Sequence, residues 1–493
     1  MSAAPTDVSV ARPAGRGLPG PRNLARLSAE FTAARWRTRT GDGVLAVLSI
    51  IAFAVAATIA NIVASGTWMF RNRAAYPTGV VAEAIAEDAS FDIIVSFYVV
   101  LALLACVLLV LPVVHLATSA TLLGARSRER RLAILRLLGM TRAEVSLLGF
   151  LEVMLQALLG VLAGGALTIA LLPAFQKLTF QSMRVRYEEM LLPWWGYLVV
   201  AGALLAITAA ASAAGLARVR ISPLGVARRE PPAVLRWWPV LAAVAVLVAV
   251  RIGTRLGGTG AGTARRIALG LIVALAFILV VDVLMPRGLQ LAARLLARLS
   301  GVTVSWASRR VAANPKPTWR RVGALTFMVL ISSFFGQMPI AAGEVDTAAA
   351  RSVAEAVLID IRLGTLFTIG FSFALAAASA MVNQASAEFE RAEETRAMLR
   401  MGVSDARLRA VNWLEALGPL VGAVLLALGL GWLMASLTGI ADAVTPDEGQ
   451  VLEPLMGHAH IAGIAGAGIV LMVLALAATG PIHRRIIAED RGR

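Results

Sequence analysis

Apolar residues in this chain fall into long runs separated by short polar segments, and strand-like alternation is absent. Most runs reach about 20 residues, the length that an α-helix needs to cross the hydrocarbon core of a bilayer. We predict ten spans, at 43–65, 94–122, 145–172, 193–217, 237–252, 267–285, 322–340, 364–383, 406–437 and 459–481. The pattern therefore predicts an all-α polytopic membrane protein with about ten transmembrane helices.

Charges between the predicted spans alternate in sign. Arginines concentrate before the first span and at 123–142, 218–236, 286–321 and 384–405, and acidic residues occupy most of the intervening segments. Because cytoplasmic loops carry the excess of basic residues, both termini are predicted to be cytoplasmic. The segment at 251–266 departs from this pattern, since it should be external but is rich in arginine. Either these arginines bind anionic headgroups, or the fifth and sixth spans form a re-entrant pair.

One stretch of the chain occurs twice. Residues 126–152 contain basic residues, a leucine-rich segment, a glycine, a hydroxyl residue and then a glutamate within an apolar run, and residues 391–415 repeat this order. The matching positions are Arg128 with Arg391, Gly139 with Gly402, Thr141 with Ser404, Leu151 with Leu414 and Glu152 with Glu415. Two copies in one chain predict two related halves.

Each copy predicts a short helix, a sharp corner and a membrane-length helix. Gly139 supplies a residue with positive φ that ends the short helix. Thr141 then caps the next helix, with Glu144 as its capping-box partner. In the second copy Ser404 is the predicted cap, but Arg407 occupies the position where a capping box needs Glu. Such a unit at the membrane surface has the shape of a lever.

These features divide the chain into five segments. Residues 1–42 are a cytoplasmic tail with an amphipathic lead-in at 23–40, which alternatively is a basic flank that only fixes orientation. Residues 43–230 form a first four-helix module, 231–286 two linker helices, 287–321 a cytoplasmic amphipathic segment and 322–493 a second four-helix module. The predicted external segments are too short for a sizeable external domain.

Composition supports the membrane class and narrows the chemistry. The 493 residues are 58% hydrophobic and only 15% charged, and the mean hydropathy is +0.76. The net charge of +16 indicates the arginine excess of cytoplasmic loops rather than nucleic-acid binding. The single cysteine, Cys106, lies within a span, so a disulfide framework or a cysteine metal site is not expected. No cleavable signal peptide is visible, and no metal-ligating or catalytic residues are assigned.

The two repeated motifs resemble the signature of the FtsX-like (MacB-type, type VII) ABC transporter permeases. The resemblance covers most of 30–230 and 305–485, so it implies two FtsX-like modules in one chain. Ten spans with a two-span insert also resemble the layout of BceB-type permeases. Those proteins carry a large external domain before the eighth span, whereas 341–363 is short here.

The resemblance implies that a separate cytoplasmic ABC ATPase docks on the repeated motifs. The expected coupling residues are Arg128, Arg131, Leu135, Gly139, Thr141, Arg391, Met398, Gly402 and Ser404. We find no Gly-x-x-x-x-Gly-Lys-Ser/Thr loop to cradle phosphates. We therefore expect no enzyme activity and no cofactor in this chain, with ATP and Mg bound by the partner. Two docking motifs on one chain predict two ATPase copies per permease chain.

Two carboxylates are predicted within spans. Glu152 and Glu415 lie eleven positions beyond their caps, about 16 Å along the helix. A carboxylate at this depth is costly, so we expect each to pair with a donor from a neighbouring helix or with an interfacial arginine. A role in transmitting movement and, less favoured, proton coupling are the alternatives. Two glycine groups, Gly160 with Gly164 and Gly463 with Gly466 and Gly468, are expected to permit close helix packing.

Three functions remain open at this point. The first is an ABC permease that exports or extracts an amphiphile (a lipid, peptide or drug) at a bacterial cytoplasmic (inner) membrane. The second is mechanotransmission, in which movement activates an external partner and nothing is carried. The third, from another class, is a proton-coupled secondary transporter, whose expected broken helices at mid-membrane are not evident. The expected partners are the ATPase and membrane lipids, without nucleic acid.

Overall fold

The computed structural model describes most of residues 41–87, 92–123, 139–219, 285–298, 301–335, 348–438 and 458–477, together with two short strands and a few single positions. The predicted lead-in at 23–40 lies outside the described residues, and so do the fifth and sixth predicted spans apart from single positions.

The first half consists of four long helices and a small hairpin with two short helices. Its helices are α2 (Gly41–Ala75), α3 (Val80–Glu87), α4 (Asp92–Leu122), α6 (Arg142–Phe175), α7 (Tyr187–Met190) and α8 (Trp194–Val219). Strands β1 (Thr179–Phe180) and β2 (Met183–Arg184) pair antiparallel, with Thr179 opposite Arg184 and Phe180 opposite Met183.

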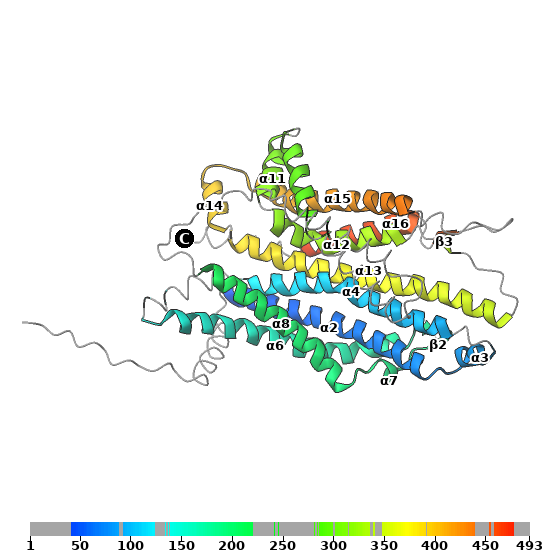
Figure 1. Cartoon of the computed structure of the whole chain (residues 1–493). Coiled ribbons are helices and arrows are strands. Elements are labelled where there is room, and N and C mark those ends of the chain that lie inside the picture. The colour runs from blue at the N-terminus through cyan, green and yellow to red at the C-terminus, as the bar shows by residue number, and fades with distance from the viewer. Residues whose placement is uncertain are drawn as a thin grey trace, which may run out of the picture.

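The second half repeats the set of four long helices. Its helices are α11 (Val302–Ala313), α12 (Pro315–Phe335), α13 (Ala348–Glu390), α14 (Ala392–Arg400), α15 (Asp405–Thr438) and α16 (His458–Ala477). Strands β3 (Pro339–Ile340) and β4 (Glu453–Pro454) pair antiparallel. Figure 1 shows an elongated helix bundle with α14 at one end and α3 and β2 at the opposite end. We call these the corner end and the hairpin end.

The described helices confirm an all-α multi-pass membrane protein. Six of them are long and apolar enough to span a bilayer, at Gly43–Ala75, Val95–Leu122, Ala143–Phe175, Trp194–Ala214, Ile359–Glu388 and Ala406–Leu433. They correspond to the first four, the eighth and the ninth predicted spans. Helices α12 and α16 occupy the positions of the seventh and tenth, although α12 begins at Pro315 and not at residue 322.

Several helices extend well beyond the predicted spans. Helix α2 continues to Ala75, and α13 has 43 residues, about 65 Å at 1.5 Å per residue. The predicted external loop at 341–363 is therefore helical from Ala348 onward. A bilayer core is only about 30 Å thick, so α13 projects from it. The apolar pattern located the membrane crossings but not the helix ends. A helix that packs against its neighbours can continue beyond the bilayer into water, where its sequence is no longer uniformly apolar.

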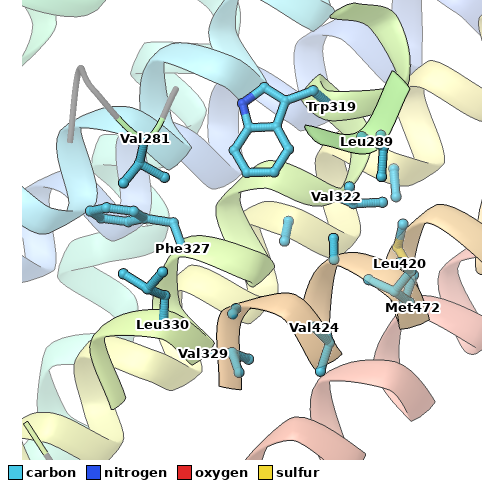
Figure 2. Packing of buried hydrophobic residues seen from close by; sticks show 14 of the residues in the cluster. Val281, Leu289, Trp319, Val322, Phe327, Val329, Leu330, Leu420, Val424 and Met472 are labelled. Carbon is cyan, nitrogen blue, oxygen red and sulfur yellow. The ribbon is translucent and has the colours of Figure 1, made fainter. Parts of the chain in front are cut away.

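The two halves have the same internal packing. Helix α2 packs against α6 and α4 in the first half, and α12 packs against α15 and α13 in the second. In the second half, Phe327 and Leu330 of α12 lie in one buried cluster with Leu420 and Val424 of α15, and Met472 of α16 joins them (Figure 2). The sequence repeat is therefore a repeat of structure.

Glycines permit the closest helix approach in the first half. A Cβ atom at Gly160 would lie 2.5 Å from the Phe53 Cβ, and one at Gly164 would lie 2.6 Å from the carbonyl oxygen of Ala54. The prediction for these two glycines is confirmed. At Gly463 and Gly466 the described residues show no such contact, because none of them lies within 4 Å of an added Cβ.

The glycine contact in the second half falls elsewhere. A Cβ at Gly431 of α15 would lie 2.8 Å from the Leu330 carbonyl oxygen and 2.6 Å from the Ser333 Cβ. The Ser333 hydroxyl also donates to the Leu428 carbonyl at 2.9 Å. Helices α12 and α15 therefore approach closely, as α2 and α6 do in the first half.

Helices α4 and α13 hold the two halves together and run in the same direction. The Tyr98 hydroxyl donates to Asp360 at 2.6 Å, and the Asn383 side chain donates to the Ser119 hydroxyl at 3.0 Å. These pairs are separated by 262 and 264 positions, and the repeat separates Gly139 from Gly402 by 402 minus 139, or 263. Equivalent positions of the halves therefore meet, as they do across a two-fold axis.

We predict that Gly164→Ala destabilises the protein and that the adjacent Gly165→Ala does not. The new methyl group at position 164 meets backbone, so α2 and α6 must separate, at a cost of about 1–3 kcal/mol. Nothing in the described structure lies within 4 Å of a Cβ at Gly165, where alanine favours the helix. Thermal unfolding in one detergent compares the variants, and equal midpoints would contradict the packing.

Candidate functional site

The first corner joins the end of the polar segment after α4 to the start of α6. Gly139 has φ of +98° and is exposed, as predicted for the stop of a short helix. The Thr141 hydroxyl accepts from the Glu144 amide at 3.3 Å, and Glu144 accepts from the Thr141 amide at 2.8 Å. The predicted capping box is confirmed, and it fixes the angle at which the chain enters α6. Arg128, Arg131 and Leu135 lie outside the described residues.

The second corner joins α14 to α15. Gly402 has φ of +89°, its amide donates to the Leu399 carbonyl at 3.0 Å, and the Val403 amide donates to the Met398 carbonyl at 3.1 Å. This pair of bonds is a Schellman motif, which rigidly ends a helix. Helix α15 starts immediately afterwards, with the Ser404 carbonyl accepting from the amides of Arg407 and Leu408. The side chain of Arg391 lies outside the described residues.

Apolar side chains are exposed at both corners. Leu137 is 88% exposed and Met401 is 74% exposed, and Ile134 is exposed as well. Both corners lie at the same end of the bundle, because α4 and α13 run in the same direction and are joined by the Ser119–Asn383 bond near that end. The structure thus presents two exposed corners with apolar side chains at the same end of the bundle.

Glu415 forms an ion pair with an arginine from a helix that precedes the second module. Glu415 is 3% exposed, and its Oε2 lies 3.5 Å from Nη1 of Arg310 in α11. The same guanidinium contacts Glu394 of α14 at 3.2 Å and lies over the Trp306 ring, 5.1 Å from its centroid. Arg310 therefore links α11, the short helix α14 and the long helix α15. The expected arginine partner of Glu415 is present.

A polar recess surrounds this ion pair. Glu388 at the end of α13 accepts from Gln384 at 3.1 Å and from Asn412 of α15 at 3.2 Å. The recess also brings together two residues singled out from the sequence, Met398 and Glu415, and its lining comprises Arg310, Gln384, Ala387, Glu388, Thr395, Met398, Leu408, Asn412 and Glu415. The end of α13, helix α14 and the start of α15 are therefore joined by side chains as well as by the corner.

Glu152 occupies the matching position in the first half. It is buried on α6, one turn before the fully buried Gln156. Both halves thus carry a buried carboxylate eleven positions after the residue that precedes the long helix, Thr141 or Ser404. Across the described ranges, no group of three or more His, Cys, Asp or Glu residues could hold a metal ion.

The sequence missed Arg310 and Glu388 as candidate site residues. Arg310 belongs to the segment 287–321, whose arginines were attributed to the general bias of cytoplasmic loops. Glu388 lies in the arginine-rich segment 384–405, where a charged residue is expected to be solvated, but it is buried. The sequence did contain a signal for Arg310. A glutamate placed deep in a span, such as Glu415, needs a cationic partner, and the arginines just before the second module are candidates.

The fold and these corners define a multi-pass α-helical membrane protein with two related modules. The family model for the FtsX-like permease C-terminal domain matches the chain twice, at residues 113–224 and 366–486. The first match begins within α4 and includes α6, α7 and α8, and the second begins within α13 and includes α14, α15 and α16. The chain belongs to the FtsX-like permease family and carries two of its domains, as a membrane subunit of the ABC transporter type. No curated protein and no solved structure matched it.

We predict that Arg310→Met lowers stability and that Glu415→Gln in the same chain restores most of the loss. Removing the guanidinium deprives a buried carboxylate of its charged partner, at a cost of about 2 kcal/mol. Arg309→Met is the matched control, because Arg309 is exposed. The unfolding midpoints of the single and double variants form the test. If the double variant loses as much as the sum of the singles, the two side chains are not coupled.

Proposed function

We propose that this chain is the permease subunit of an ABC transporter in which a separate cytoplasmic ATPase drives both corners. The single observation that carries the proposal is the pair of exposed corners at one end of the bundle, each joined stiffly to a membrane-spanning helix. A docked ATPase that moves Leu137 or Met401 moves α6 or α15 with it.

The bonding at each corner favours transmission of movement over local bending. The capping box at Thr141 and the Schellman motif at Gly402 each fix the angle between a short segment and a long helix. At the second corner, Arg310 adds a tie between α14 and α15. A force on α14 therefore reaches α15 through the backbone and through the ion pairs. The first corner has a capping box, whereas Arg407 stands in place of the capping-box glutamate at the second corner, so we propose that the two ATPase contacts are not equivalent.

In this proposal the partner supplies the nucleotide chemistry. ATP and Mg are bound by the ATPase, and two ATPase copies serve one permease chain because the chain has two corners. The corner end faces the cytoplasm, where both termini lie, and the membrane is the bacterial cytoplasmic membrane with its lipids as further partners. The arginine-rich segments next to both corners support this orientation.

The proposed cargo is an amphiphile, such as a lipid, peptide or drug, that is exported or extracted from the membrane. The buried faces of the described spans are mostly apolar with scattered hydroxyl and amide groups, which suits an acyl or other apolar portion better than a fully hydrated solute. A second candidate is mechanotransmission to an external partner, and the projection of α13 beyond the bilayer favours it by giving such a partner an accessible helix.

We predict that Leu137→Glu and Met401→Glu each weaken binding of the partner ABC ATPase, and that the double variant abolishes copurification. Both side chains are exposed, so folding should be unaffected. Tyr76→Glu is the matched control, because Tyr76 is 78% exposed at the hairpin end. Native mass measurement should give two ATPases per wild-type permease chain. A complex with two permease chains contradicts the proposed stoichiometry.

We also predict that the permease–ATPase complex in nanodiscs hydrolyses ATP faster when a transported amphiphile is added. A graded series of lipids, cationic peptides and drugs provides the candidates, and a complex carrying Met401→Glu provides the uncoupled control. Stimulation together with net movement of the amphiphile supports transport. Full ATPase coupling with no movement of any candidate, but with activation of an external protein, supports mechanotransmission instead.

A further inference from the structure

A single carboxylate joins the two halves at the hairpin end. Asp360 of α13 is 6% exposed, and its Oδ2 accepts two hydrogen bonds, from the Tyr98 hydroxyl and from the Gln181 amide, each at 2.6 Å. Both donors belong to the first half. Tyr98 lies on α4 and Gln181 lies in the turn between β1 and β2. Asp360 is therefore the polar contact through which the second half holds the small hairpin of the first.

The hairpin turn that Asp360 holds is strained. Gln181 and Ser182 have φ of 56° and 62°, the arrangement of a two-residue turn in which glycine or asparagine is usual. At positive φ, residues other than glycine and asparagine have unfavourable steric contacts between the side chain and the backbone. The hydrogen bond from the Gln181 amide to Asp360 offsets part of this cost. Without that bond, the turn is free to relax toward a backbone conformation of lower energy.

The base of the hairpin is fixed independently within the first half. Arg73 of α2 is 6% exposed and donates to the carbonyls of Phe180 and Arg184. Its Nε and Nη2 also both donate to Oε2 of Glu189, at 3.0 and 2.7 Å. A small apolar cluster including Met69 and Leu172 lies beside it. The hairpin thus remains attached to α2 whether or not Asp360 holds its tip.

Helix α13 connects this contact directly to the second corner. It runs without an internal proline from Asp360 to Glu390, two residues before α14, whereas its counterpart α4 contains Pro112. Asn383, bonded to Ser119, lies near the corner end, and Asp360 lies 23 residues away, about 34 Å along the helix. A small tilt about the Asn383 contact therefore displaces Asp360 more than the residues next to α14.

We propose that Asp360 is a releasable clasp between the two halves: when the corner end is driven, α13 tilts, Asp360 leaves Tyr98 and Gln181, and the hairpin end opens. The proposal rests on the proposed function for its driving force. Release is feasible because Ser182, next to the bonded amide, is exposed, so water can reach the groups that the clasp frees. Between the clasp and the Asn383 contact, Phe367 meets Phe175 at 5.8 Å, an apolar contact that permits sliding.

A distance measurement tests the clasp without the ATPase. Spin labels are attached at Tyr76→Cys and Ile359→Cys, both exposed positions, in a Cys106→Ala background in nanodiscs. Wild-type clasp residues should give one narrow distance population, and Asp360→Ala and the milder Tyr98→Phe should add a longer one. Glu188→Gln is the matched control, an exposed carboxylate at the same end. An unchanged distribution in Asp360→Ala overturns the proposal.

The same labels with the ATPase trapped in its nucleotide-bound state test release. The wild-type distance distribution should shift toward that of Asp360→Ala. If the distribution does not change while the permease still stimulates ATP hydrolysis, the Asp360 contact does not open, and the proposal is overturned. If the permease never affects an ATPase, the proposed function fails, whereas the ATPase-free comparison still decides whether Asp360 holds the halves together.

A reversible crosslink tests the clasp without removing Asp360 or Tyr98, so the clasp residues stay intact. Ser182→Cys is joined to Leu363→Cys, one turn from Asp360 on the same face of α13, with a reducible bifunctional reagent in the Cys106→Ala background. The locked protein should lose permease-stimulated ATP hydrolysis, and reduction should restore it. Locked protein that retains full stimulation contradicts the clasp. The uncrosslinked double variant is the control for the substitutions themselves.

Discussion

The parallel pairing of α4 and α13 is the constraint on which the rest of the arrangement depends. The two helices are bonded at Tyr98 and Asp360 near one end and at Ser119 and Asn383 near the other. Because equivalent positions meet, the axis relating the two halves passes between these helices. That relation places both corners at one end of the bundle, where the proposed ATPase contacts lie.

Charge is buried in this protein at the two ends of the bundle, where water and backbone groups are close. Arg310 with Glu394 and Glu415 lies at the corner end, and Arg73 with Glu189 lies at the hairpin end. An ion pair is costly in the hydrocarbon core, and much less so near the interface. The middle of the bundle is instead joined by apolar clusters and close glycine contacts. Hydrogen bonds and ion pairs thus fix the arrangement of the helices at the ends of the bundle, and close packing of apolar side chains and glycines fixes it at the centre.

The halves share a fold but differ at their corners and in the helices α4 and α13 that join them. The first corner has a capping box, whereas the second has Arg407 in place of the capping-box glutamate and carries the Arg310 ion pairs. Helix α4 contains Pro112, whereas α13 has no internal proline and is longer. Within the described residues, Arg73 holds the hairpin of the first half. In the proposed complex, the ATPase would therefore meet two corners that differ in their bonding.

The sequence by itself determined the features that depend on neighbours along the chain. Runs of apolar residues placed the described spans, the repeat gave the two halves, and Gly139, Thr141 and Glu144 gave the first corner, since a cap is formed within a few residues. Tertiary structure decided the rest. Arg310 with Glu415 and Asp360 with Tyr98 are distant in sequence, and the choice of Gly431 over Gly463 depends on which helix face meets a neighbour. An apolar run records that a helix enters the membrane, but in a nearly uniform apolar helix it does not record which side is covered or how far the helix continues beyond the bilayer.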